Sequence, residues 1–172
     1  MKKIILCSML FLATALYAES GWLDSAQVSL QSLKKFAPSN AHAELRWING
    51  FNYFKMYTKN NLGFFVEVDH EMGLIVFKSF WLANSGLSEN RAARIANKYN
   101  MHAVYGNASF IEGDESREGD ESRFVLICVI PFNGGVIQDN FESNVAWFRK
   151  SVDFFDDILR CEDALLKDED AL

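Results

Sequence analysis

The chain has 172 residues, of which 49% are hydrophobic and 23% charged, a balance that excludes an intrinsically disordered protein and predicts one domain with its own core. Its formal net charge is −6, which argues against nucleic acid or an anionic membrane surface as a partner. Three cysteines are too few for a disulfide-dense scaffold.

The N-terminal segment, residues 1–18, has the features of a secretory signal peptide. Lys2 and Lys3 precede an apolar stretch from Ile4 to Leu16. This stretch is shorter than the roughly 20 residues that a helix needs to span a bilayer. We predict cleavage after Ala18, with cleavage after Ala15 as the alternative. The mature protein would then be exported across the inner membrane to the periplasm and would have no membrane attachment.

A helix and a series of strands are expected after the leader. Apolar residues recur at helical spacing from Trp22 to Phe36, and Pro38 marks the end of that helix. Runs of strand-forming residues separated by short turns then predict an antiparallel meander of three or four strands. The expected strands are Ala43–Ile48, Phe51–Tyr57, Gly63–Asp69 and Leu74–Leu82.

The C-terminal half is expected to contain two helices and two strands. Ser88 is a candidate N-cap for a helix that ends near Asn100. The strands His102–Ile111 and Arg123–Phe132 come next, and the second is apolar almost throughout, which is typical of a central strand covered on both faces. The last helix is expected to begin near Asp139 and to bury an apolar stripe.

A tandem repeat lies between the last two strands. Glu112–Arg117 and Glu118–Arg123 have the same sequence, Glu-Gly-Asp-Glu-Ser-Arg, without an apolar side chain, so we interpret them as a solvated hairpin loop. A calcium site is the alternative, but the EF-hand pattern is absent. The acidic residues 162–172 are expected to form a frayed tail, which leaves residues 19–161 as the single folded domain.

No residue pattern indicates catalysis, a metal or a cofactor. His42, His70 and His102 lack the spacing of a local zinc site, and the motifs of nucleophile elbows, P-loops and dinucleotide sites are absent. Glu67 and Asp69 share one face of an expected strand, which a solvated outer surface explains better than acid–base chemistry does. We therefore expect no catalytic residues, no metal ligands, no cofactor and no enzymatic activity.

The two cysteines that follow the leader are not expected to pair. If the last helix folds back on the preceding strand, Cys161 lies more than about 30 Å beyond the turn at 1.5 Å per helical residue, whereas Cys128 lies close to the turn. We expect Cys128 to be buried and Cys161 to be available for a bridge between two chains.

Three stretches together resemble the YbjN-like family. Asn97-Lys98-Tyr99-Asn100 matches the N-x-W-N end of that family's second helix, with tyrosine in place of tryptophan. The run from Ile130 to Val136 is similar to its strand followed by a Gly-Gly-Val turn, and Trp147 to Phe155 is similar to a W-x-x-x-(apolar)-x-x-F pattern. The matched positions are Asn97, Tyr99, Asn100, Gly134, Gly135, Trp147 and Phe155.

The resemblance implies a fold like that of type III secretion chaperones, in a family often described as a candidate sensory transduction regulator. The implied class is α+β in the order α-β-β-β-α-β-β-α, an antiparallel sheet of about five strands with helices packed on it. The resemblance allows homodimerisation and implies no catalytic residues.

The matched residues also have purely structural interpretations. Asn97 and Asn100 fall at a helix end, where asparagine can cap free carbonyls. Gly134 and Gly135 are expected to supply positive φ in a tight turn, and the stripe of Trp147 and Phe155 is more typical of a core than of a cofactor site.

We therefore expect a secreted, non-enzymatic module that binds an unknown protein or peptide, with a regulatory or chaperone-like role. The 15 Phe, 4 Trp and 5 Tyr residues supply aromatic surface for a groove or a dimer face. The alternative is a periplasmic protein that binds a small ligand or an ion, at the Gly134-Gly135 helix entrance or in the acidic loop 112–123.

Overall fold

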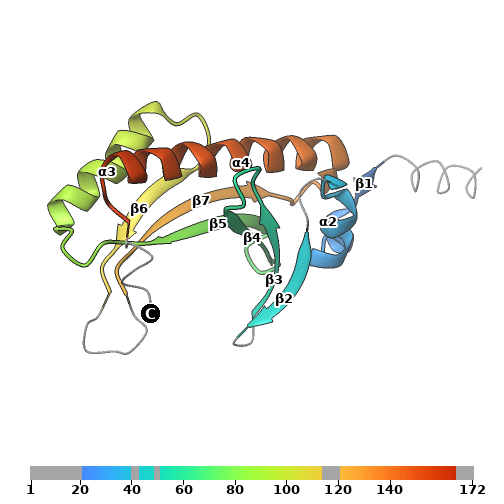
Figure 1. Cartoon of the computed structure of the whole chain (residues 1–172). Coiled ribbons are helices and arrows are strands. Elements are labelled where there is room, and N and C mark those ends of the chain that lie inside the picture. Colours follow the sequence, from blue (N-terminus) through green and yellow to red (C-terminus); the bar gives the residue numbers. More distant parts are fainter. Residues whose placement is uncertain (1–20, 40–42, 49–50, 114–120, 166–172) are drawn as a thin grey trace, which may run out of the picture.

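The computed structural model describes residues 21–39, 43–48, 51–113 and 121–165, so the predicted signal peptide and most of the acidic repeat lie outside the described residues. Within these ranges the main sheet is antiparallel and six-stranded, in the order β2-β3-β4-β5-β7-β6, and β1 pairs with β8 in a separate ribbon (Figure 1). The strands are β1 (Trp22–Leu23), β2 (Glu44–Ile48), β3 (Phe51–Tyr57), β4 (Gly63–Asp69), β5 (Leu74–Leu82), β6 (Asn107–Ile111), β7 (Arg123–Pro131) and β8 (Val136–Ile137). The helices are η1 (Ser25–Gln27), α2 (Leu30–Phe36), α3 (Glu89–His102) and α4 (Gln138–Cys161).

The predicted α+β class and the antiparallel sheet with packed helices are confirmed. The layout differs from the implied order by one strand, because four strands of the described sheet precede α3 instead of three. The additional strand is β2, which pairs with β3 along its whole length and forms one edge of the sheet. The described sheet therefore has six strands where the resemblance implied about five.

The first helix is shorter than predicted. Trp22 and Leu23 form β1, and their pairing with β8 replaces the helical conformation that their spacing suggested. The carboxylate of Asp24 then accepts a hydrogen bond from Ala26 N at 3.3 Å and begins the short η1 turn. The α-helix itself begins only after Ser29, whose hydroxyl caps Ser32 N at 3.2 Å.

The strand expected from His102 also begins later. Helix α3 continues to His102, and β6 starts at Asn107 after a turn in which Gly106 has a φ of +79°. The predicted N-cap, Ser88, occupies its position but makes no side-chain capping hydrogen bond.

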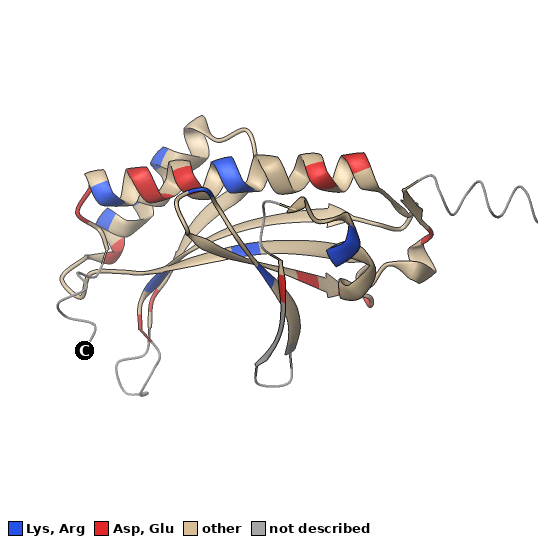
Figure 2. Ribbon diagram, turned by 45° about the vertical axis from the view of Figure 1, so that its right-hand side comes forward, with Lys and Arg blue, Asp and Glu red and all other residues tan. Residues whose placement is uncertain are grey.

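The core lies between the sheet and α4, which crosses one face of the strands (Figure 1). Buried rings make edge-on contacts across this layer, with centroids 5.4 Å apart for Phe64 and Phe148 and 5.2 Å apart for Trp81 and Phe155. Such contacts add to the apolar burial that holds a helix on a sheet. Acidic and basic residues are distributed along α4 (Figure 2), and Asp139, Lys150 and Asp157 are exposed.

A buried polar contact attaches the end of α4 to the sheet. Trp81 Nε1 donates to Asp156 Oδ1 at 3.0 Å, and Arg160 Nε donates to Asp156 Oδ2 at 2.6 Å. Both carboxylate oxygens are therefore satisfied, as burial of a charged group requires.

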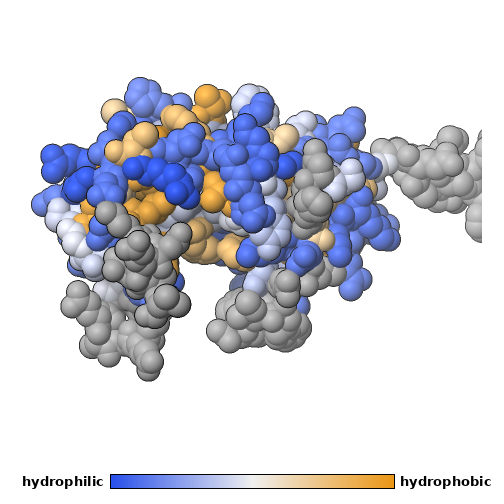
Figure 3. All heavy atoms as spheres, viewed as in Figure 1, coloured by the Kyte–Doolittle hydropathy of each residue, from blue (hydrophilic) through white to orange (hydrophobic). Residues whose placement is uncertain are grey.

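The second face of the sheet has no helix on it in the described part of the chain. Figure 3 shows hydrophobic atoms reaching the surface below α4, over the strands. Phe80 of β5 is 45% exposed and Val129 of β7 is 52% exposed. The predicted cover on both faces of β7 is therefore absent at Val129, although Val125 on the same face is 1% exposed, because an apolar run does not show which of its side chains lie under a helix. None of the described helices is long and apolar enough to cross a membrane.

Candidate functional site

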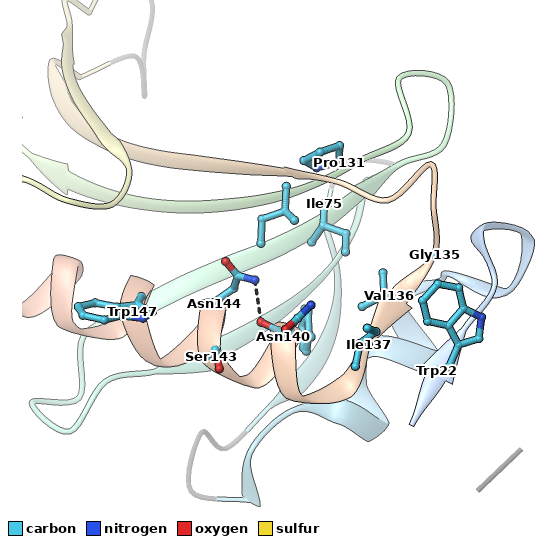
Figure 4. A pocket seen from close by; sticks show the side chains of 12 residues that line it. Trp22, Ile75, Pro131, Gly135, Val136, Ile137, Asn140, Ser143, Asn144 and Trp147 are labelled. Carbon is cyan, nitrogen blue, oxygen red and sulfur yellow. Dashed lines mark hydrogen bonds between the residues drawn. The ribbon is translucent and has the colours of Figure 1, made fainter. Parts of the chain in front are cut away.

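A pocket of about 410 Å³ lies between the first half of α4, the end of β7 and the β1–β8 ribbon (Figure 4). This volume falls in the range of sites that hold a small molecule or the side chains of a peptide. The floor consists of Ile75 and Phe141, which also belong to the core. The pocket is thus built on rigid elements rather than on loops.

Two tryptophans stand at opposite ends of the pocket (Figure 4). Trp22 comes from β1 and is 38% exposed, and Trp147 comes from the third turn of α4 and is 50% exposed. The Lys150 ammonium lies 4.6 Å from the centre of the Trp147 ring and covers one of its faces. Exposed tryptophans beside a hollow are typical of binding sites, because a ring of this size loses much solvent contact when a partner covers it.

Uncharged polar groups line the helix side of the pocket. Asn144 Nδ2 donates to Asn140 O at 2.7 Å, and the hydroxyl of Tyr105 donates to Asn144 Oδ1. These two bonds orient Asn144, whereas the side chains of Asn140 and Ser143 are exposed at the pocket and available to a ligand.

The groups behind this wall stay neutral. Burial raises the pKa of the Tyr105 hydroxyl far above its usual range, so the phenol keeps the proton that it donates to Asn144. Burial likewise raises the pKa of the Cys128 thiol, which makes it a poor nucleophile at neutral pH. None of the described residues that line the pocket has an ionisable side chain. The site therefore suits an apolar or neutral polar ligand and offers no acid–base pair.

Within the described residues, the pocket borders a short edge of β7 that no other strand covers. Ala108 directs its N–H and C=O away from β7, because both bond to the Asn100 side chain, at 2.8 and 2.9 Å. In an antiparallel ladder the neighbouring residues face the other way, so Asn107 bonds to Ile127. The same alternation directs the N–H and C=O of Val129 to this edge, beyond the end of β6, and the C=O makes a weak contact with Cys128 Sγ at 4.0 Å. A peptide strand can therefore pair with Val129 while its side chains enter the pocket.

The family-motif residues separate into different roles. Phe155 is fully buried, as predicted, but Trp147 lies at the pocket and not in the core. Tyr99 is also fully buried and donates to Tyr105 O at 2.7 Å. Asn100 does not cap its own helix, because it binds the edge of β6, and Asn97 is exposed.

The two glycines of the family motif also have different roles. Gly135 has a φ of +88°, and a Cβ there would lie 2.5 Å from Trp22 Cζ2 and 2.6 Å from Leu23 O. Gly134 has no positive φ, and a Cβ there would meet nothing within 4 Å. The expected positive φ is thus confirmed for Gly135 only.

The helix entrance beside these glycines is a poor anion site. Gln138 N, the first amide of α4, donates to Gly21 O at 2.6 Å. Asp139 places a carboxylate in the first turn, where it already complements the helix dipole. Residues 114–120 of the acidic loop, the other site proposed for an ion, lie outside the described residues.

The remaining ionisable candidates have structural partners. Glu67 pairs with Lys78 at 2.6 Å, and Asp69 Oδ1 accepts from Met72 N at 2.9 Å in the following turn. The described residues contain no group of three or more His, Cys, Asp and Glu side chains that could hold a metal ion. Cys128 is half-buried rather than buried, Cys161 is exposed, and both are free thiols.

The pocket as a whole is not predictable from the sequence. The helical spacing that starts at Trp22 predicts a helix there, and Ser143 and Asn144 have no pattern of their own. Gly135 and Trp147 are the family-motif positions that line the pocket, and the sequence favours structural roles for both, with the Gly134-Gly135 helix entrance as the alternative ligand site. The available signal was the Gly-Gly turn, since a glycine that admits no side chain indicates a close neighbour, which here is Trp22.

No family model and no curated protein matches the sequence. The structure, however, superposes on the crystal structure of YbjN from E. coli, which is described as a proposed transcription regulator. The TM-score is 0.67 over 84% of this chain and 98% of that chain, at 11% sequence identity. The chain has the YbjN fold. The relationship to YbjN predicted from the three short stretches is therefore confirmed at the level of the fold.

Proposed function

We propose that the chain is a secreted, non-enzymatic module that binds an extended, uncharged segment of another protein in the pocket between α4 and β7. The leader-like residues 1–18 support export to the periplasm, and the YbjN fold is compatible with a regulatory or chaperone-like role. The observation that carries the proposal is the neutral pocket beside an unpaired strand edge, with a tryptophan at each end.

The pocket and the edge together favour a peptide over an isolated small molecule. A small molecule would need the pocket alone, whereas an extended chain also satisfies the N–H and C=O of Val129. Alternate side chains of such a strand point to the same face, so every second residue can enter the pocket. A second copy of this chain remains one partner that this geometry would accept.

The test is binding of uncharged peptides of about nine residues that alternate Val, Leu or Phe with Thr. Fluorescence polarisation should detect binding, and Trp147→Ala should weaken it at least about tenfold, because truncation of an interface tryptophan commonly costs about 2 kcal/mol. Met101→Ala is the matched control, since Met101 is exposed and does not line the pocket. Affinity should change little between pH 5 and 9 because no ionisable group lines the pocket.

Equal losses for Trp147→Ala and Met101→Ala would contradict the proposal, as would a panel in which no peptide binds.

A further inference from the structure

The pocket lies where the described chain begins. Gly21 O accepts the hydrogen bond from Gln138 N at the start of α4, and the next residue, Trp22, is part of the pocket wall. Residues that precede Gly21 are therefore tethered to the rim of the pocket by the β1–β8 pairing.

The tethered segment has the chemistry that the pocket accepts. No charged residue occurs between Lys3 and Glu19, and Ile4 to Leu16 are predominantly apolar. The pocket likewise has no ionisable group among its described lining residues. Burial of apolar side chains in such a site is favourable without any cost of charge desolvation.

The tether also has sufficient length. The pocket follows α4 from Ile137 to Trp147, which is about 15 Å at 1.5 Å per residue. Leu16 lies five residues before the anchored Gly21, and five extended residues span about 17 Å, so Leu16 and the residues before it can reach the far end.

We propose that the apolar stretch Ile4–Leu16 occupies this pocket while the leader is attached, and that removal of the leader opens the pocket to the partner. The inference rests on the proposed function of the same pocket. A short tether gives an effective concentration on the order of millimolar, so even a segment of weak intrinsic affinity fills the site in cis and competes with a partner in trans. Binding is thereby coupled to export and processing.

The first experiment asks where the leader lies. The precursor is made by cell-free synthesis, which leaves the leader attached, with Ser143→Cys at the pocket and Cys161→Ser to remove the exposed thiol. Mild oxidation at low protein concentration should join Cys7 to the new thiol within one chain. The matched control is Ala146→Cys, which is exposed on the same helix and does not line the pocket.

We expect the Ser143→Cys chain to cross-link several times faster than the Ala146→Cys chain. Equal rates would overturn the inference, because they would show a tether that samples the surface without preference.

The second experiment separates this inference from the proposed function. The same peptide panel is titrated into the precursor and into residues 19–172, which include every described element. We expect at least tenfold weaker binding to the precursor. Equal binding to both would overturn the inference but not the proposed function. Binding to neither, with selective cross-linking at position 143, would overturn the proposed function and leave the leader in the pocket.

Discussion

Gly135 packs directly against the indole of Trp22 and has a backbone conformation that other residues rarely adopt. Its neighbour Gly134 faces open space and has no positive φ. The adjacent pair thus separates a glycine required by the fold from one that is not. Because Gly135 has no side chain, the Trp22 indole can pack against it and form part of the pocket wall.

Gly135→Ala should destabilise the protein by about 2–4 kcal/mol, through left-handed strain and the clash with Trp22 and Leu23. Gly134→Ala should have no effect or should stabilise the protein by up to about 1 kcal/mol, because alanine restricts the unfolded chain. Urea unfolding of both variants measures the difference. Equal destabilisation by the two substitutions would show that the turn, and not the contact with Trp22, requires glycine.

The burial of individual side chains is what the sequence predicts least well. Trp147 and Phe148 are neighbours on one helix, yet Phe148 is fully buried and Trp147 lines the pocket. Helical periodicity defines a stripe of apolar side chains but not its edges, and a residue at the edge is buried only if something lies opposite. What lies opposite Trp147 is a hollow between elements distant in sequence.

At the scale of elements, the side chain of Asn100 makes the two hydrogen bonds with the Ala108 backbone that a neighbouring strand would otherwise make. It donates to Ala108 O and accepts from Ala108 N, so the outer edge of β6 is partly satisfied by α3. The contact explains why an asparagine suits this helix end, and it couples α3 to the sheet. It also protects an edge that would otherwise be open to pairing.

Asn100→Ala should therefore cost about 1–2 kcal/mol of stability, since it leaves a backbone N–H and C=O without partners. Asn97→Ala, three residues earlier on the same helix and exposed, should change stability by less than about 0.5 kcal/mol. Unfolding curves, together with faster hydrogen exchange at the Ala108 amide in the first variant alone, would check this expectation. Unchanged exchange at Ala108 would show that Asn100 does not protect the edge.

Elements with strong local patterns were predicted well. The observed bounds of β3, β4 and β5 are the predicted ones, because period-two alternation and the turns between the strands define both ends. The segment from Trp22 was predicted wrongly because its conformation depends on β8, more than a hundred residues away. Local periodicity contains no information about such a partner.

At the scale of the whole molecule, the chain after α4 folds back onto the sheet. Ala164 is fully buried, its carbonyl accepts from Asn84 N at 2.9 Å, and Leu165 bridges to Ala83. Lys98 of α3 pairs with Glu162 at 2.7 Å. The folded part therefore extends at least to Leu165, beyond the domain end predicted at residue 161. Acidic composition alone suggested fraying, and it did not reveal these contacts.

This closure should depend on pH. The Lys98 ammonium lowers the pKa of Glu162 below its usual 4.5, so the pair stabilises the fold above that pH and is lost as pH falls through the lowered pKa. Glu162 in turn raises the pKa of Lys98, so the contribution persists up to about pH 10. Hydrogen exchange at the Asn84 amide, corrected for its intrinsic pH dependence, should accelerate below about pH 4.

The matched control is Glu162→Gln, in which the acid-induced acceleration should be absent. The Lys98 side chain is exposed and that of Glu162 is partly exposed, so the effect should be small and should weaken with added salt. If acid accelerates hydrogen exchange at the Asn84 amide equally in Glu162→Gln, then groups other than Glu162 make the contact after α4 depend on pH.

The stretch of β7 that no described strand covers is too short to support repeated addition of strands from other chains. β6 covers the strand up to Ile127, and Pro131, two residues beyond Val129, has no amide hydrogen to offer. An incoming strand thus finds a single residue, Val129, that directs both its N–H and its C=O to this edge before the ladder ends, and the Cys128 thiol already makes a weak contact with that C=O at 4.0 Å. Fibril growth by repeated edge-to-edge stacking needs a long flat template, and this molecule exposes too little of one here to seed amyloid.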